Sequence, residues 1–149
     1  MKRLNKSITI LLADDDPEDR QMILEAFNEN RLANNFHSVE DGEELMDYLY
    51  YRDKYVDPMN APRPGLILLD LNMPRKSGQE ALAEIKKDPE LKRIPVVVLT
   101  TSKMEEDVIR SYDLGVSGFI IKPVTFSGLV EAIKSLGQYW FEIVELPHL

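Results

Sequence analysis

Acidic side chains follow two apolar segments of the sequence, at the point where each segment ends. Residues 66–69 are all leucine or isoleucine and lead directly into Asp70, and residues 8–13 lead into Asp14 and Asp15. Apolar runs without alternation are typical of strands buried on both faces, as in the middle of a parallel sheet. The carboxyl ends of such strands meet at one edge, where open α/β sheets place their ligands. The pattern therefore predicts that Asp14, Asp15 and Asp70 lie together, although they are far apart in the sequence.

Carboxylates crowded at one edge repel one another unless a cation lies among them. Oxygen ligands without histidine or cysteine suit a hard ion such as Mg²⁺, which keeps several waters. Asp70 is then a carboxylate beside a metal ion, and in this position it could receive a phosphoryl group. Thr100 and Lys122, at two further strand ends, would offer a hydroxyl and an ammonium group to the phosphoryl oxygens. Each residue alone could be an ordinary surface or capping residue, but five such groups at four strand ends indicate a site.

Short apolar segments alternate with helical patterns along the chain. Further strands are predicted at 35–39, 94–100 and 118–121, and helices at 17–30, 44–51, 79–87, 105–114 and from about 125 onward. Asp16 and Pro17 suit the N-cap and first position of the first helix, and Thr125 or Ser127 suits the cap of the last. Strands separated by helices imply right-handed crossovers and a parallel sheet covered on both sides. We expect an α/β, flavodoxin-like (βα)5 doubly wound sheet with strand order 2-1-3-4-5.

The size and composition of the chain favour one globular domain. Its 149 residues suit a core at about 8–136 with a C-terminal helical extension or tail at about 137–149. The net charge of −8 argues against nonspecific nucleic-acid binding. No apolar run is long enough to span a bilayer, and the N-terminus does not have the pattern of a signal peptide. The absence of cysteine excludes disulfides and is compatible with a cytoplasmic protein.

Residues 52–64 interrupt the regular alternation of strands and helices. This stretch contains three prolines, shows no periodicity and is long for a connection inside a compact domain. Both a partner-binding feature and a tolerated insertion are consistent with it.

The candidate site residues, taken together, resemble the receiver domains of two-component response regulators. The resemblance consists of the acidic pair Asp14-Asp15, the motif Asp70-Leu71-Asn72-Met73-Pro74, Thr100, and Phe119 followed by Lys122-Pro123, in this order over nearly the whole chain. It implies that Asp70 is the phosphoacceptor and binds Mg²⁺ directly together with Asp15. Asp14 is expected to act through water, and the main-chain carbonyl of Asn72 to complete the protein ligands.

The same resemblance assigns the switch residues. Thr100 and Lys122 would contact the phosphoryl group, and Phe119 would change rotamer when Thr100 moves. Lys122-Pro123 would be a cis peptide, which is inexpensive before proline. Thr101 is bulkier than the alanine or glycine common beside the switch threonine, so we expect slower access to the phosphoryl group. Phe119 lacks the hydroxyl of the more frequent tyrosine.

The loop at 52–64, the segment 93–102 and the tail at 139–147 resemble a narrower group, the single-domain response regulators associated with bacterial phytochromes. A sensor histidine kinase is therefore the expected partner, and a bacteriophytochrome is one candidate. Few residues follow the final helix, so we expect no output domain and a signal that leaves through a surface. We expect a homodimer built from helix 105–114, strand 118–121, the final helix and its apolar tail. The alternative is a longer final helix that folds back on its own domain.

Two other functions are compatible with parts of the sequence. A phosphatase with an aspartate nucleophile would use an Asp-x-Asp motif, which Asp14-Asp15-Asp16 contains. Asp16 is better explained as a helix cap, however, and Asp70 has the more suitable neighbours. A flavin-binding protein of the flavodoxin type is disfavoured, because an acidic loop after the first strand would repel a flavin phosphate.

Overall fold

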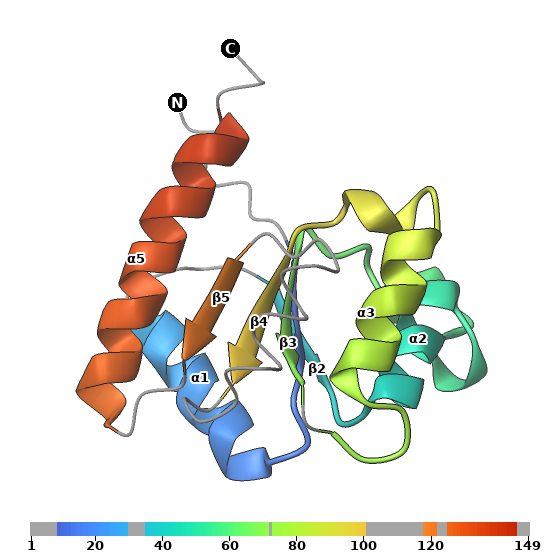
Figure 1. Ribbon diagram of the computed structural model, residues 1–149, viewed down its shortest axis with the longest axis horizontal. Coiled ribbons are helices and arrows are strands. Elements are labelled where there is room, and N and C mark those ends of the chain that lie inside the picture. The colour runs from blue at the N-terminus through green and yellow to red at the C-terminus, as the bar shows by residue number, and fades with distance from the viewer. Residues whose placement is uncertain (1–8, 30–34, 72, 101–117, 122–124, 146–149) are drawn as a thin grey trace.

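A five-stranded parallel sheet forms the centre of the protein (Figure 1). The computed structural model describes residues 9–29, 35–71, 73–100, 118–121 and 125–145, with only the backbone at 100, 118–121 and 136–145. The strands are β1 (Thr9–Ala13), β2 (Asn35–Val39), β3 (Leu66–Asp70), β4 (Val96–Thr100) and β5 (Gly118–Ile121). Their order, β2-β1-β3-β4-β5, confirms the predicted flavodoxin-like topology.

Helices cover both faces of this sheet (Figure 1). They are α1 (Pro17–Glu29), α2 (Gly42–Tyr50), α3 (Gly78–Lys87) and α5 (Phe126–Glu145). Helices α1 and α5 lie together on one face, and α2 and α3 lie on the other. The predicted helix at 105–114 lies outside the described residues. In the described part of the chain, none of the helices is both long enough and apolar enough to cross a membrane.

The core consists of two apolar layers, one on each face of the sheet. Side chains alternate between the layers along each strand, so that Leu11 and Ile67 pack with α2 and α3. Ile10 and Leu68 point the other way and pack with α1 and α5. All residues of β1 and β3 are buried, which explains why their sequences show no polar alternation.

Side-chain caps determine where the helices begin. The Asp16 carboxylate accepts from the amide of Glu18 at 2.9 Å, which confirms the predicted cap of α1. The Thr125 hydroxyl accepts from the Gly128 amide at 3.0 Å, so Thr125 rather than Ser127 caps α5. Helix α2 begins two residues earlier than predicted, because the side chain of Asp41 caps it by accepting from the Glu44 amide at 2.8 Å.

The connection between α2 and β3 is more structured than its sequence indicated. It contains two single-turn 3₁₀ helices, η2 (Asp53–Tyr55) and η3 (Pro58–Asn60). The Tyr48 hydroxyl of α2 donates to the carbonyl oxygen of Pro62 at 2.8 Å, and the rings of Tyr48 and Tyr55 lie 5.1 Å apart. The connection is therefore anchored along α2.

The last helix is longer than is needed to cover one face of the sheet. Helix α5 runs without interruption from Phe126 to Glu145 and extends beyond the sheet (Figure 1). It passes through the predicted boundary between core and extension at 136–137 as regular helix. The division of the chain into a core and an extension stays a prediction.

Candidate functional site

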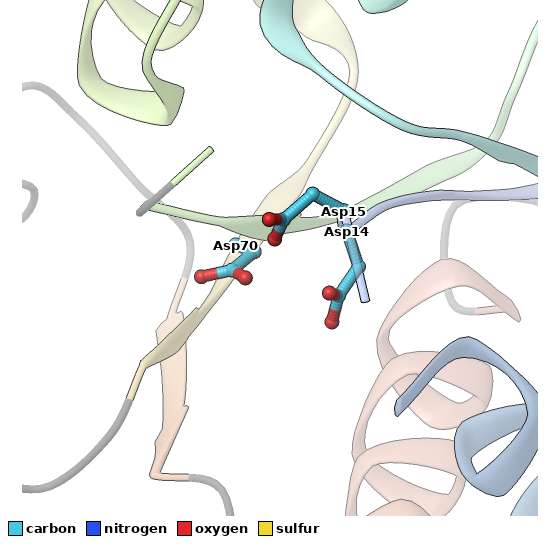
Figure 2. Close-up of side chains that lie close together, drawn as sticks. All are labelled: Asp14, Asp15 and Asp70. Carbon is cyan, nitrogen blue, oxygen red and sulfur yellow. The ribbon is translucent and has the colours of Figure 1, made fainter. Parts of the chain in front are cut away.

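Three aspartates meet at the carboxyl end of the two central strands. Asp14 and Asp15 follow β1, and Asp70 is the last residue of β3, which pairs directly with β1. One carboxylate oxygen from each lies within 4.8 Å of the others, and Figure 2 shows the three side chains at this edge. The sheet order thus produces the predicted cluster, because it makes the first and third strands neighbours.

The surroundings of Asp14 hold it rigidly in the cluster. Its side chain is fully buried, and its carboxylate accepts from the amide of Asp16 at 3.0 Å. Its own amide donates to the carbonyl oxygen of Val39 at 3.1 Å, and its carbonyl oxygen accepts from the Arg20 guanidinium at 2.8 Å. Arg20 was not predicted as a site residue, since an arginine in the first turns of a helix has many possible partners. Asp14 is thus fixed by its main chain as well as by its carboxylate.

The three carboxylates differ in their access to solvent. Asp14 and Asp70 are buried, with 0% and 7% of their surface exposed, whereas Asp15 is exposed. Buried carboxylates this close to one another are costly in the ionised form unless hydrogen bonds or a cation compensate. The cluster therefore has two buried carboxyl groups and an open side toward solvent at Asp15.

The cluster fits a hard divalent cation. All its donors are carboxylate oxygens, which Mg²⁺ and Mn²⁺ prefer over nitrogen or sulfur. In an octahedral Mg²⁺ site, two ligands on opposite sides of the ion lie about 4.2 Å apart, which is twice the metal–oxygen distance. The oxygens of Asp14, Asp15 and Asp70 are at most 4.8 Å apart, so direct ligands together with bound waters can fill this space. The exposed side at Asp15 leaves access for the waters.

Two glycines allow the chain to approach the site closely. A Cβ atom on Gly78, the first residue of α3, would lie 2.3 Å from the carbonyl oxygen of Asp70. The Gly78 amide donates to the carbonyl oxygen of Leu71 at 3.0 Å and so closes the loop after β3. A Cβ atom on Gly42 would lie 2.1 Å from the carbonyl oxygen of Lys76 in the same loop. The only sequence signal for either role was a glycine next to a helix start.

The described backbone places Thr100 at the same edge and Phe119 within the neighbouring strand β5. Thr100 is the last residue of β4, and Asp70 pairs with the preceding residue, Leu99. Phe119 lies in β5, where its backbone pairs with Val98. Asn72, Thr101, Lys122 and Pro123 lie outside the described residues, as does the predicted cis peptide.

Asp16 does not have the role that a phosphatase of the Asp-x-Asp type would require. Its carboxylate accepts from the amides of Glu18 and Asp19, at 2.9 and 3.4 Å, and so is engaged in capping α1. The observed contacts agree with the helix-cap interpretation.

A doubly wound sheet with three carboxylates at the ends of its first and third strands is the architecture of a receiver domain. The family described as the response regulator receiver domain matches residues 10–134. The chain belongs to this family, and it is a signalling phosphoacceptor rather than a conventional enzyme.

Several relatives of known sequence or structure are similar to this chain over most of its length. Response regulator Rcp1 of Synechocystis sp. (strain ATCC 27184 / PCC 6803 / Kazusa) is 42% identical over 143 residues, covering 96% of this chain and 95% of the relative. The crystal structure of the phosphorylated cyanobacterial phytochrome response regulator RcpA is 46% identical, with a TM-score of 0.81, and covers 90% of this chain and 94% of that one.

A second solved structure, the Mn²⁺-bound form of Rcp1, is 41% identical with a TM-score of 0.80, covering 91% of this chain and 95% of that one. These similarities confirm the predicted relation to the phytochrome response regulators.

Proposed function

We propose that the protein accepts a phosphoryl group from a sensor histidine kinase onto Asp70 in a Mg²⁺-dependent reaction. The observation that carries this proposal is the position of Asp70, at the end of a buried strand and within 4.8 Å of two further carboxylates. Its low exposure, 7%, favours an acceptor that is reached only from the open edge of the sheet. The phosphorylated relative RcpA supports the same chemistry.

The transfer requires a nucleophile and a phosphoryl donor. An oxygen of the Asp70 carboxylate attacks the phosphorus of an N-phosphoryl imidazole on the kinase and forms a new P–O bond. The P–N bond breaks, its electron pair remains on the imidazole nitrogen, and that nitrogen takes a proton from solvent. Asp70 thereby becomes an acyl phosphate.

The other proposed site residues bind the metal and the phosphoryl group. Asp14, Asp15 and Asp70, with the main-chain carbonyl of Asn72, would hold Mg²⁺. When bound, the metal supplies positive charge next to the phosphoryl oxygens. The Thr100 hydroxyl and the Lys122 ammonium would donate to those oxygens. The aromatic ring of Phe119 would move with Thr100 and carry the change to the surface.

Incubation with Mg²⁺ and a small acyl phosphate tests the proposal. Mass spectrometry should detect one base-labile phosphoryl group per chain, and Asp70→Asn should abolish it. Chelation of the metal should also prevent the modification. Modification of Asp70→Asn to the extent of the wild type, or insensitivity to chelation, would contradict the assignment. Turnover of a generic phosphate ester would instead indicate a phosphatase.

A bacteriophytochrome is the kinase that we propose as the donor, because the relatives include a cyanobacterial phytochrome response regulator and a bacteriophytochrome response regulator. Copurification from the native cell, followed by identification of the bound kinase, tests this partner.

For the output we propose a homodimer through helix 105–114, strand 118–121, the last helix and the tail. The length of α5, which continues to Glu145, supports this surface because the helix extends beyond the sheet.

A further inference from the structure

The segment from the end of β2 to the start of α2, residues 39–42, is hydrogen-bonded to Asp14 of the acidic cluster and to the loop that follows Asp70. The amide of Asp14, a member of the cluster, donates to the carbonyl oxygen of Val39 at 3.1 Å. Three residues later, the amide of Gly42 donates to the carbonyl oxygen of Lys76 at 3.0 Å. Lys76 belongs to the β3–α3 loop, residues 71–77, which directly follows the predicted phosphoacceptor. The segment that opens α2 therefore connects the β1 side of the site to the β3 side.

The contact between Gly42 and the β3–α3 loop is tight enough to fix the position of the loop. Gly42 is buried, and a Cβ atom there would lie 2.1 Å from the Lys76 carbonyl oxygen and 2.7 Å from its carbonyl carbon. Any side chain at this position would push α2 and the loop apart. The neighbours Asp41 and Glu43 both reach Arg75, at 3.6 and 3.5 Å. Because Arg75 is 63% exposed, these ion pairs contribute little to holding the loop against α2. The backbone contact at Gly42 therefore fixes the position of the loop.

The same turn of α2 also anchors the connection at 52–64. The Glu44 carboxylate accepts from the Tyr55 hydroxyl at 2.5 Å and from the Glu40 amide at 2.8 Å, and Lys54 lies 3.1 Å away. Burial raises the pKa of the Glu44 carboxyl, but the hydrogen bonds from Tyr55 and Glu40 outweigh it and hold the pKa below its usual range. Glu44 is therefore an ionised acceptor to which the connection is attached.

We propose that the first turn of α2 positions the β3–α3 loop for metal binding, with Gly42 as the positioning residue, and that Tyr55 holds this turn in place through Glu44. The connection at 52–64 then influences the site without touching it. This inference rests on the proposed function, since it requires that the aspartate cluster binds a divalent cation.

Metal binding by the unphosphorylated protein tests the proposal without any transfer reaction. Isothermal titration calorimetry with Mn²⁺ compares the wild type with Gly42→Ala and Tyr55→Phe. The matched control is Tyr50→Phe, which loses a tyrosine hydrogen bond of 2.8 Å to Asp88 at the far end of α2. Hydrogen exchange of residues 71–77, measured in parallel, reports on the loop itself.

We expect Gly42→Ala to weaken Mn²⁺ binding about tenfold, as changes to groups that support metal ligands commonly do. Tyr55→Phe should weaken binding about threefold, because one hydrogen bond to a charged group is lost. Both variants should exchange faster than the wild type in 71–77, and Tyr50→Phe should match the wild type in both measurements. Because Gly42→Ala can fail to fold, the comparison of the two tyrosine variants tests the proposal by itself.

The outcomes separate this inference from the proposed function. Wild-type affinity and loop exchange in Tyr55→Phe, or equal losses in Tyr55→Phe and Tyr50→Phe, would overturn the inference alone. A folded Gly42→Ala that binds Mn²⁺ like the wild type would also overturn it. If the wild type binds no Mn²⁺, or if Asp15→Asn binds as well as the wild type, the proposed function fails and the inference with it.

Discussion

Replacement of Gly78 by alanine should destabilise the protein, although alanine is the better helix former. Gly78 is the first residue of α3, and a Cβ atom there would lie 2.3 Å from the Asp70 carbonyl oxygen and 2.7 Å from the Cα atom of Leu71. Both obstacles are backbone atoms, which cannot rotate away as a flexible side chain could. The start of α3 must therefore move away from the end of β3.

Two opposing contributions determine the magnitude. The exchange of glycine for alanine gains up to about 1 kcal/mol in a helix interior and less at its first position. Overpacking of a closely packed contact costs about 1–3 kcal/mol. The overpacking is larger, so we expect a net loss of about 1–2 kcal/mol in the free energy of unfolding. The loss should be greater if the movement also opens the Gly78–Leu71 hydrogen bond of 3.0 Å.

Urea unfolding measures this loss. The midpoint should fall by about 0.5–1 M with an unchanged slope. Ala83→Gly in the same helix is the control. It replaces alanine by glycine, the opposite of Gly78→Ala, at a half-buried position, and it should cost about 1 kcal/mol from helix propensity alone. A midpoint for Gly78→Ala equal to or above that of the wild type would show that the approach of α3 to Asp70 is not restrictive.

Three further predictions concern pH, the switch and the output surface. Burial raises the pKa of Tyr48 from 10.0 to about 12. Its contribution to stability is therefore complete below pH 10 and is lost as the pH rises toward 12. Tyr48→Phe should reduce the slope of the free energy of unfolding against pH in this range. If the slope is unchanged in the variant, another group is responsible. Lys122→Ala should still be phosphorylated, but phosphorylation should no longer shift the backbone amide NMR signals around Thr100 and Phe119. Shifts as large as those of the wild type would show that Lys122 is an ordinary surface residue. Light scattering should show a dimer for the intact chain and a monomer after truncation before Tyr139, whereas a monomer at all concentrations, phosphorylated or not, would refute the dimer.

Local patterns were sufficient to predict the strands and most helix starts. Strands buried on both faces have unalternated apolar sequences, and β1 and β3 are such strands. Asp16 and Thr125 mark helix starts because their short polar side chains accept from amides two or three residues later. The start of α2 was predicted too late, since a Gly following the Asp41 cap reads equally well as a turn.

The acidic cluster was also predictable, but through topology rather than through local pattern. Once the alternation of strands and helices indicated the 2-1-3-4-5 order, the ends of β1 and β3 had to be neighbours. Asp14, Asp15 and Asp70 could then be placed together without any knowledge of side-chain positions. The register of a parallel sheet restricts strand ends strongly enough for this inference.

Contacts between loops and helix ends were decided only by the tertiary structure. The amide of Gly42 pairs with Lys76, the hydroxyl of Tyr55 with Glu44, and the guanidinium of Arg20 with the Asp14 carbonyl oxygen. A glycine, a tyrosine and an arginine at these positions have many possible partners, and no local periodicity selects among them. Selection occurs when the packed helices bring one backbone carbonyl or carboxylate within hydrogen-bonding distance and exclude water from the alternatives. The identity of the site therefore follows from the strand order, whereas its support depends on how closely α2 and α3 pack against the loop after Asp70.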